Sequence, residues 1–404
     1  MEEKNIAIGF VTGRKSFRNV LKTYAYHWKG LIHEYPLRVH LIAAYDLNYQ
    51  HTNISDYVHI QKDVRDIFQS VTFLGPNDIE QMKKNTAAQL TRSEADLLFE
   101  NGYAGKRNAV LYKAIQNHMD ALVFLDDDEY PLAVTNRHGT ALWSGQNVFV
   151  EHLKNLETND ITNGYHCGYI SPIPIIPYSD DFTKEDFRVF INSLQNDALH
   201  WETIRKLNRT GGVTYAEINV LRNPKVFGLA ENKSDKLPIT GSNLGINLTN
   251  PLRTVPFFNP KGARGEDMFF GFALKGKNVV RIPAYTFHDG FQMYPWLLNG
   301  VLPIHLKEIH LSDPGVGERF YKACIGWFRY KPLYLLLTDS SHYQEEAEKI
   351  RTILGHLTPK MENYFHLPFT QLVREFTRYS HRVEKDAERY EETQEVWQKL
   401  MQIG

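Results

Sequence analysis

Cysteine is scarce in this chain, since Cys167 and Cys324 are the only two among 404 residues. Two cysteines cannot form the disulfide framework that holds many small secreted domains together. Hydrophobic residues make up 42% of the chain and charged residues 23%, which is typical of a globular protein with ample core material. The length predicts one large domain or two to three domains of ordinary size.

Long apolar runs and an excess of one charge are also missing. No stretch approaches the roughly 20 apolar residues that span a bilayer. The chain starts with MEEKNIAIGFVTGR, whose early acids and short apolar run are unlike a signal peptide. Lys and Arg number 46 against 47 for Asp and Glu, so broad binding to nucleic acid, which needs a basic surface, is not expected. We expect a cytoplasmic protein, with peripheral contact to a membrane left open.

Strands and helices alternate in the first part of the chain. Apolar runs predict strands over 5–11, 38–44 and 71–74, and helical spacing predicts helices over 17–31 and 58–66. Such alternation is typical of βαβ units in a parallel sheet, which binds ligands at the carboxyl ends of its strands. Polar residues stand at two of these ends, namely Thr12, Arg14 and Asp46. A helix cap and a solvated loop acid are the alternative interpretations.

The segment Gly105-Lys106-Arg107-Asn108 opens a predicted helix. Two cations at the start of a helix are unfavourable for the helix dipole, unless an anion such as a diphosphate binds there. A surface turn with ordinary basic residues is the alternative. The segment is not a P-loop, because it lacks GxxxxGK[ST].

The segment Ala121–Leu125 predicts a buried strand that stops at four acids, Asp126, Asp127, Asp128 and Glu129. Clustered carboxylates are hard oxygen ligands that suit Mg²⁺ or Mn²⁺. On an extended segment, residues two apart point to one side, so Asp126 and Asp128 are expected to face a ligand together while Asp127 points elsewhere. A solvated acidic turn is the alternative, and Glu129 receives no role.

Three features stand out in the second part. Thr135–Gly145, with Trp143, is expected to be a polar loop, and 240–248 is expected to be a strand facing a cavity. Glu266 and Asp267 stand in the first turn of a predicted helix, where capping alone would explain them. His288 is expected in a loop after a strand over 278–282; a surface histidine is the alternative.

From Pro303 onward the chain is predicted to be largely helical, with helices over 343–355, 369–380 and 384–402. This extension could be a cap, an oligomerisation element or a peripheral membrane foot. An ordinary packed extension is the interpretation that we favour.

The order of these motifs resembles that of the GT-A glycosyltransferases, which use nucleotide sugars, and most closely the family-2-like group. The motifs that carry the resemblance are Gly105-Lys106-Arg107-Asn108, Asp126-Asp127-Asp128, Gly265-Glu266-Asp267 and His288. It implies an α/β fold with a Rossmann-like, mostly parallel sheet flanked by helices, here followed by a helical C-terminal extension. We divide the chain into a GT-A domain over 1–300, with a nucleotide-binding half (1–131) and an acceptor-binding half (132–300), and the extension over 301–404.

The resemblance also implies an activity: metal-dependent transfer of a sugar from a UDP- or GDP-sugar to an acceptor hydroxyl. Asp126, Asp128 and His288 would bind Mn²⁺ or Mg²⁺. Asp267 would be the general base of an inverting transfer, with Glu266 as the alternative; retention of configuration stays open. The residues assigned to the nucleotide sugar are Thr12, Arg14, Asp46, Gly105, Lys106, Arg107, Asn108, Asp126 and Asp127. Of these, Asp126 is also assigned to the metal.

The acceptor, a saccharide or another hydroxyl compound, is expected near Trp143, Ser242 and Asn243. The basic loop before Asn108 and the long region over 131–239 depart from the common pattern, so neither donor nor acceptor is identified. Two other functions stay open: a nucleotidyltransferase-like metal enzyme, and a non-catalytic protein that keeps the fold for binding. A homo-oligomer through the C-terminal helices is a further expectation.

Overall fold

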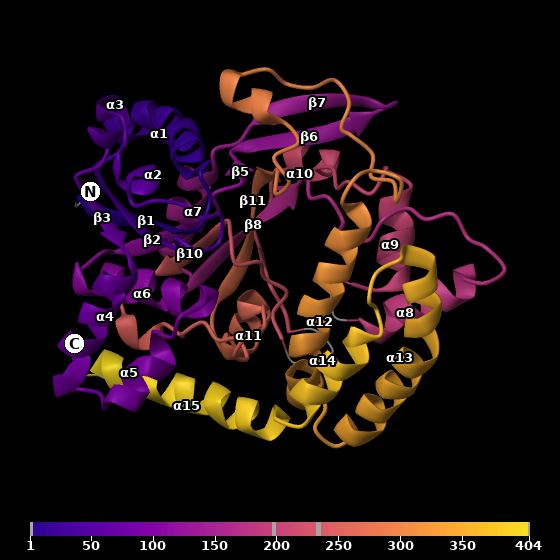
Figure 1. Cartoon of the computed structure of the whole chain (residues 1–404). Coiled ribbons are helices and arrows are strands. Elements are labelled where there is room, and N and C mark those ends of the chain that lie inside the picture. Colours follow the sequence, from indigo (N-terminus) through magenta and orange to yellow (C-terminus); the bar gives the residue numbers. More distant parts are fainter. Residues whose placement is uncertain (1–2, 196–198, 232–235, 403–404) are drawn as a thin grey trace.

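One nine-stranded sheet forms the centre of the protein, as the computed structural model shows (Figure 1). The structure describes residues 3–195, 199–231 and 236–402. The strand order is β3-β2-β1-β4-β10-β8-β11-β5, and β9 pairs with β11 outside this path. The strands of the sheet are β1 Lys4–Thr12, β2 Leu37–Tyr45, β3 Ser70–Leu74, β4 Ala121–Leu125, β5 Glu129–Tyr130, β8 Ile161–Cys167, β9 Phe227–Gly228, β10 Leu244–Asn247 and β11 Val279–His288.

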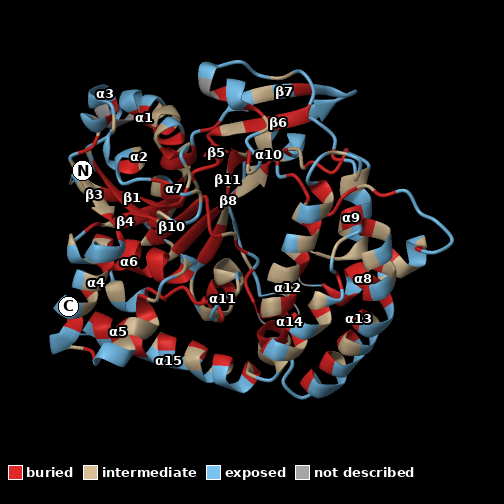
Figure 2. Ribbon diagram, viewed as in Figure 1, coloured by how far each residue is buried: buried red, intermediate tan, exposed pale blue. Residues whose placement is uncertain are grey.

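Most strands of the sheet run in one direction. β1, β2, β3 and β4 pair in parallel, and so do β8 and β11. β10 is antiparallel to both β4 and β8, while β5 and β9 are antiparallel to β11. β4 is buried along its whole length, as expected for a strand covered on both faces. Figure 2 shows the same burial across the central strands. The predicted α/β fold with a mostly parallel sheet and a helical C-terminal region is confirmed.

The strands that follow β1 in the sequence lie on both sides of it in the sheet. The chain first crosses to β2 and β3 on one side of β1, and then returns to β4 on the other side. The carboxyl ends of β1 and β4 therefore flank a topological switch point. In open α/β sheets this is the place where ligands bind.

Two hydrophobic clusters cover the two faces of the sheet. Ile6 and Ile8 of β1 belong to one cluster, while Ala7 and Val11 belong to the other, because neighbouring side chains in a strand point to opposite faces. The first cluster includes α1 and α7, and the second includes α4, α5 and α6. These helices are α1 Phe17–Glu34, α4 Pro76–Asn85, α5 Arg92–Leu98, α6 Tyr103–Gln116 and α7 Val148–Leu156.

A third cluster joins helices from two distant parts of the chain. Phe190 of α8 meets Phe320 and Phe328 of α12 edge-to-face, with ring centroids 6.2 and 6.0 Å apart. Most helical residues of this cluster come from α8 Lys184–Ser193, α9 Trp201–Asn208, α12 Val316–Thr338, α13 Tyr343–Phe365 and α14 Gln371–Ser380. The domain division at residue 300 stays a prediction. In this cluster, α8 and α9 share a core with the C-terminal helices.

The last helix, α15 Val383–Gln402, runs back to the first half of the molecule and contacts α5 (Figure 1). Trp397 is fully buried in the second cluster, and its Nε1 donates to Thr254 Oγ1 at 3.0 Å. Val396 and Leu400 join the same cluster. The C-terminal helix therefore completes the core beside the sheet.

Shorter elements connect these layers. They are α2 Ser55–Val58, α3 Lys62–Arg65, η1 Thr86–Ala88, α10 Ile218–Arg222, η2 Pro251–Arg253, α11 Glu266–Ala273 and η3 Pro295–Asn299. Within the described ranges, no helix is both long and apolar enough to cross a membrane.

The loop predicted over Thr135–Gly145 is a two-stranded ribbon instead. β6 Leu132–Arg137 pairs antiparallel with β7 Thr140–Gly145. His138 and Gly139 join them with φ angles of 52° and 85°, as a tight hairpin turn requires. Ala133, Val134 and Thr135 of β6 are buried in a row, whereas most residues of β7 are exposed.

His288 is the last residue of β11 rather than a loop residue, so the prediction of a loop was wrong. Pro283 suggested an early end to the strand. It lies within the register shift of the β11–β8 pairing, between Arg281 and Tyr285, where its missing N–H breaks no ladder.

We predict that Trp397→Ala destabilises the whole first half of the molecule. Truncating a buried tryptophan costs about 3–5 kcal/mol, and this one also leaves Thr254 Oγ1 without its donor. Urea unfolding of the full chain measures the loss. Glu395→Ala, an exposed position on the same helix, should stay within about 0.5 kcal/mol of the parent. A loss below about 1 kcal/mol for Trp397→Ala would show that α15 does not stabilise the sheet.

Candidate active site

Acidic and basic side chains meet at the switch point between β1 and β4. Thr12 ends β1, and Asp127 and Asp128 follow β4 in a turn, where both are buried. The alternative of a solvated acidic turn is therefore excluded for these two carboxylates. The extended segment expected over 126–128 is a turn, so the rule that residues two apart share one side does not apply here.

Arg14 is the counter-charge of Asp127 and Asp128. Its Nε lies 3.1 Å from Asp127 Oδ1, and its Nη2 lies 2.7 Å from Asp128 Oδ2. Thr12 Oγ1 donates to Asp127 Oδ2 at 2.5 Å. Burial raises the pKa of Asp127 to about 7, with the charge of Asp128 adding to the shift and Arg14 opposing it. One guanidinium thus stabilises two carboxylates that would otherwise repel each other.

Arg107 is the counter-charge of Asp126. Its side chain is only 2% exposed, and its Nη2 lies 3.2 Å from Asp126 Oδ1. Its Nε lies 3.6 Å from Glu266 Oε1, and its Nη1 donates to the Gly241 carbonyl at 2.5 Å. Burial raises the pKa of Asp126 to about 6 although Arg107 opposes the shift. Arg107 therefore joins the end of β4 to the 241 loop and to the start of α11.

Lys106 is paired in the same way with a carboxylate on the neighbouring strand end. Its Nζ lies 2.8 Å from Asp46 Oδ2 and donates to Asn101 Oδ1 at 3.3 Å. The helix that carries Lys106 and Arg107 begins at Tyr103, before the predicted start at Gly105, and both side chains are buried. The alternative of a surface turn is thus excluded, but neither cation is free to bind an anion in this structure.

Gly105 and Asn108 hold α6 in place. A Cβ at Gly105 would lie 2.1 Å from the Glu100 carbonyl oxygen, so a larger residue would displace the helix. Asn108 Nδ2 donates to the carbonyls of Leu98 and Phe257, and its Oδ1 accepts from the Phe257 amide. The side chain of Asn108 therefore links α6 to the 257–264 loop.

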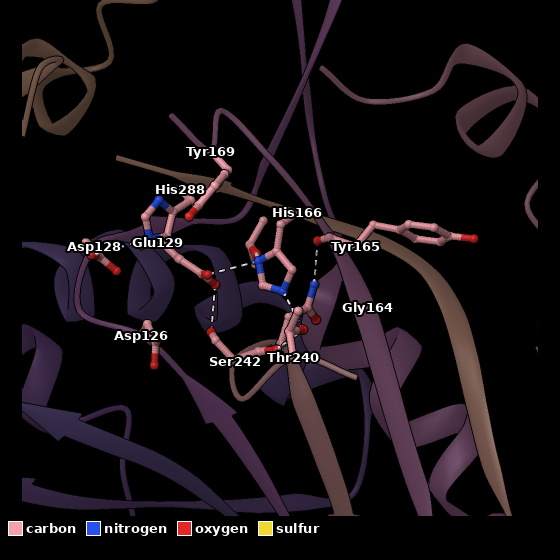
Figure 3. A network of polar contacts seen from close by, with 12 residues as sticks. Asp126, Asp128, Glu129, Gly164, Tyr165, His166, Tyr169, Thr240, Ser242 and His288 are labelled. Atoms are coloured by element: carbon pink, nitrogen blue, oxygen red, sulfur yellow. Dashed lines mark hydrogen bonds and ion pairs between the residues drawn. The ribbon is translucent and has the colours of Figure 1, made fainter. Parts of the chain in front are cut away.

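Glu129 forms a buried network that was not predicted from the sequence. Its Oε1 lies 2.9 Å from His166 Nδ1, and its Oε2 accepts from Ser242 Oγ at 2.7 Å (Figure 3). His166 Nε2 lies 2.8 Å from Thr240 Oγ1. Burial alone would raise the pKa of Glu129, but His166 and Ser242 lower it to about 2. Burial lowers and Glu129 raises the pKa of His166, with a raised value as the outcome.

This network brings Ser242 to the end of β4, whereas Asn243 and Trp143 lie elsewhere. Asn243 is buried at φ 49°, and its side chain binds His152 Nε2 and the carbonyls of Tyr165 and Ala284. Trp143 donates its Nε1 to the Pro303 carbonyl at 2.8 Å. The polar groups of both side chains are thus bonded within the protein, and their contact with an acceptor stays a prediction.

Glu266 and Asp267 stand side by side at the start of α11. Gly265, the N-cap, has a φ of 96°, which favours glycine and turns the chain into the helix. Asp267 Oδ1 accepts from the Met268 amide at 2.8 Å, leaving Oδ2 without a hydrogen bond among the described residues. Burial, followed by the negative charge of Asp267, raises the pKa of Glu266 to about 7. Of the two, Glu266 alone is tied to the β4 end through Arg107.

The donor chemistry of Asp128 and His288 fits a divalent cation. Asp128 Oδ2 and His288 Nε2 lie 3.6 Å apart, close to the roughly 3 Å between adjacent ligands of one small ion. His288 Nδ1 is buried without a hydrogen-bond partner. The same Asp128 oxygen now faces Arg14, and Asp126 faces Arg107. Across the part of the chain that the structure describes, no three such side chains are gathered closely enough to hold an ion.

Comparisons with known proteins leave the family open. No family model and no curated protein matches the chain. Among solved structures, a crystal structure of S. aureus TarS 1–349 in complex with UDP-GlcNAc is similar over 95% of this chain and 92% of that one. The two share 10% identity and a TM-score of 0.34, which is too low to carry an argument.

We predict that Glu266 makes the stability of the protein depend on pH. Its pKa rises from 4.5 to about 7 on folding, so between these values the unfolded chain releases a proton that the folded chain keeps. The contribution of Glu266 to stability is therefore fully present below pH 4.5 and is lost as the pH rises to about 7. The stability of the parent relative to Glu266→Gln should fall between pH 5 and 8 by an amount on the order of 1–3 kcal/mol.

Urea unfolding at several pH values measures this difference. Glu395→Gln, at an exposed position, serves as the control and should not change the pH dependence. A parent–variant difference that stays constant with pH would mean that Glu266 is ionised throughout.

Proposed function

We propose that the protein is a metal-dependent glycosyltransferase of the GT-A type, which moves a sugar from a UDP- or GDP-sugar to an acceptor hydroxyl. The observation that carries the proposal is the convergence at the switch point. Carboxylates from the β4 end lie across from Arg14 of the β1 end, and Arg107 connects them to the Glu266-Asp267 pair of the other half. A transferase for nucleotide sugars needs both parts: a charged end for the diphosphate and a carboxylate for the acceptor.

The donor would bind along the carboxyl ends of β1, β2 and β4. Thr12, Arg14 and Asp46 would contact the nucleotide, and Lys106 or Arg107 would stabilise the diphosphate or the donor sugar. Tyr49 is exposed beside Arg14, with the guanidinium carbon 5.8 Å from its ring centre. Such a ring could stack on a base.

Asp126, Asp128 and His288 would hold Mn²⁺ or Mg²⁺. When bound, this cation would stabilise the negative charge of the departing diphosphate as a Lewis acid. The charges of the chain itself support the assignment, because Arg14, Lys106 and Arg107 are all paired with carboxylates. If an anionic donor pairs with these cations instead, the buried carboxylates lose their counter-charges, and the metal ion would replace them.

Asp267 would take the proton from the acceptor hydroxyl. The hydroxyl oxygen forms its bond to the anomeric carbon while the bond to the diphosphate oxygen breaks, and the proton passes to the carboxylate, which gives inversion. Asp267 Oδ2 carries no hydrogen bond among the described residues and could accept the proton. Glu266, with a pKa near 7, is the alternative base.

A donor screen tests the proposal. We expect UDP- or GDP-sugars with Mn²⁺ to raise the thermal unfolding midpoint, because a ligand that binds only the folded state stabilises it. Asp128→Asn should lose at least half of the metal-dependent shift, measured from the ligand-free midpoint of the same variant. Lys349 is an exposed residue of α13, so Lys349→Gln is the matched control and should respond as the parent does.

Product analysis separates the remaining functions. Release of UDP or GDP supports a glycosyltransferase, and release of pyrophosphate would identify a nucleotidyltransferase. Donor binding without any product would identify a non-catalytic binding protein. No shift with any nucleotide would overturn the proposal.

We predict that Asp267→Asn loses transfer at least a hundredfold while donor binding stays within about twofold, since general bases typically contribute a factor of 10²–10⁴. Single-turnover transfer and the thermal shift with donor measure the two effects. Glu266→Gln provides the comparison. If Glu266→Gln abolishes transfer and Asp267→Asn does not, Glu266 is the base; if Asp267→Asn abolishes donor binding, its role is structural.

A further inference from the structure

A strap over residues 295–305 crosses the surface beside the β6–β7 ribbon, where Figure 1 draws it in orange next to β7. It is fixed at both ends. Leu297 and Leu306 are buried in the first hydrophobic cluster, and the Lys307 amide donates to Tyr294 Oη at 2.7 Å. The strap is thus held firmly although it is largely irregular.

Hydrogen bonds attach the strap to the ribbon along its length. The Ala141 amide donates to the Ile304 carbonyl at 2.8 Å, and Trp143 Nε1 donates to the Pro303 carbonyl. His305 Nδ1 lies 2.7 Å from the Gly139 carbonyl. Strap and ribbon therefore form one continuous surface.

This surface exposes large apolar side chains. Ile304 is 67% exposed, Trp296 64% and Val301 58%, and Leu302 and Leu142 are also exposed. Single apolar residues on a surface are ordinary, but a group of this size marks a site of interaction. We call these five residues, with Arg137 and Lys307, the strap face.

The strap face carries positive charge and no nearby acid in its own segments. No acidic residue occurs between Glu129 and Glu151 or between Asp289 and Glu308. Arg137 and Lys307 are both exposed within these segments. Glu308, which follows Lys307, is paired with His310 at 3.2 Å.

We propose that the strap face binds the surface of a membrane containing anionic lipids. Tryptophan is favoured at the boundary between headgroups and acyl chains, where aliphatic neighbours enter the apolar layer. Each Arg or Lys near an anionic leaflet adds electrostatic attraction. A partner protein would not by itself require segments free of acidic residues, whereas an anionic surface repels every carboxylate. This assignment does not depend on the proposed reaction.

Co-sedimentation of the full chain with vesicles tests the proposal. The parent should bind vesicles of phosphatidylcholine with phosphatidylglycerol, and more weakly those of phosphatidylcholine alone. Trp296→Ser/Ile304→Ser should weaken binding to the mixed vesicles roughly tenfold or more. Arg137→Ser/Lys307→Ser should weaken it by a similar factor and reduce its sensitivity to salt.

A matched control lies on another part of the surface. Ile54→Ser/Val58→Ser removes two exposed aliphatic side chains near α2 and should bind vesicles as the parent does. Thermal unfolding confirms that each variant is folded. The proposal is overturned if the parent binds no vesicles, if neutral and anionic vesicles bind equally, or if Trp296→Ser/Ile304→Ser binds as the parent does. A parent dimer that this variant splits, without vesicle binding, would instead assign the face to a second copy.

Discussion

The buried guanidinium of Arg107 is the contact on which the arrangement of the site depends. It neutralises Asp126 after β4 and Glu266 at the start of α11, and it binds the carbonyl of Gly241. Three segments that are far apart in the sequence therefore meet at one side chain. Removing one partner of a buried ion pair costs about 3–5 kcal/mol, because the other charge is left without compensation. This single cation therefore links the acidic pair on α11 to the end of β4.

The same balance of charge extends across the switch point. Arg14 pairs with Asp127 and Asp128, and Lys106 pairs with Asp46. Each of these cations is therefore paired with at least one carboxylate before any ligand arrives, and the carboxylates outnumber the cations. An anion that binds here has to compete with carboxylates for these cations, and a cation has to compete with guanidinium groups for the carboxylates. Such a site favours the joint entry of an anion and a cation over either one alone.

Much of the sheet could be predicted from the sequence, because a strand buried on both faces is a continuous apolar run. β4 and its acidic end are an example. The β6–β7 ribbon could not be predicted, since its turn is polar and most of β7 is exposed, which is also typical of a loop. The sequence also placed Glu266 and Asp267 correctly at a helix start. It could not show that Glu129 pairs with His166, because neither local spacing nor composition reveals a contact made only when β5 and β8 are brought together by β11.

The return of α15 to the sheet has a consequence for the order in which the protein folds. Trp397 and Leu400 belong to the core beside β1 and β4, yet they lie far along the chain from these strands. The first half therefore cannot close its apolar face on the ribosome before α15 has been translated. For this protein, the usual order in which the N-terminal part folds first gives way to a completion that waits for α15.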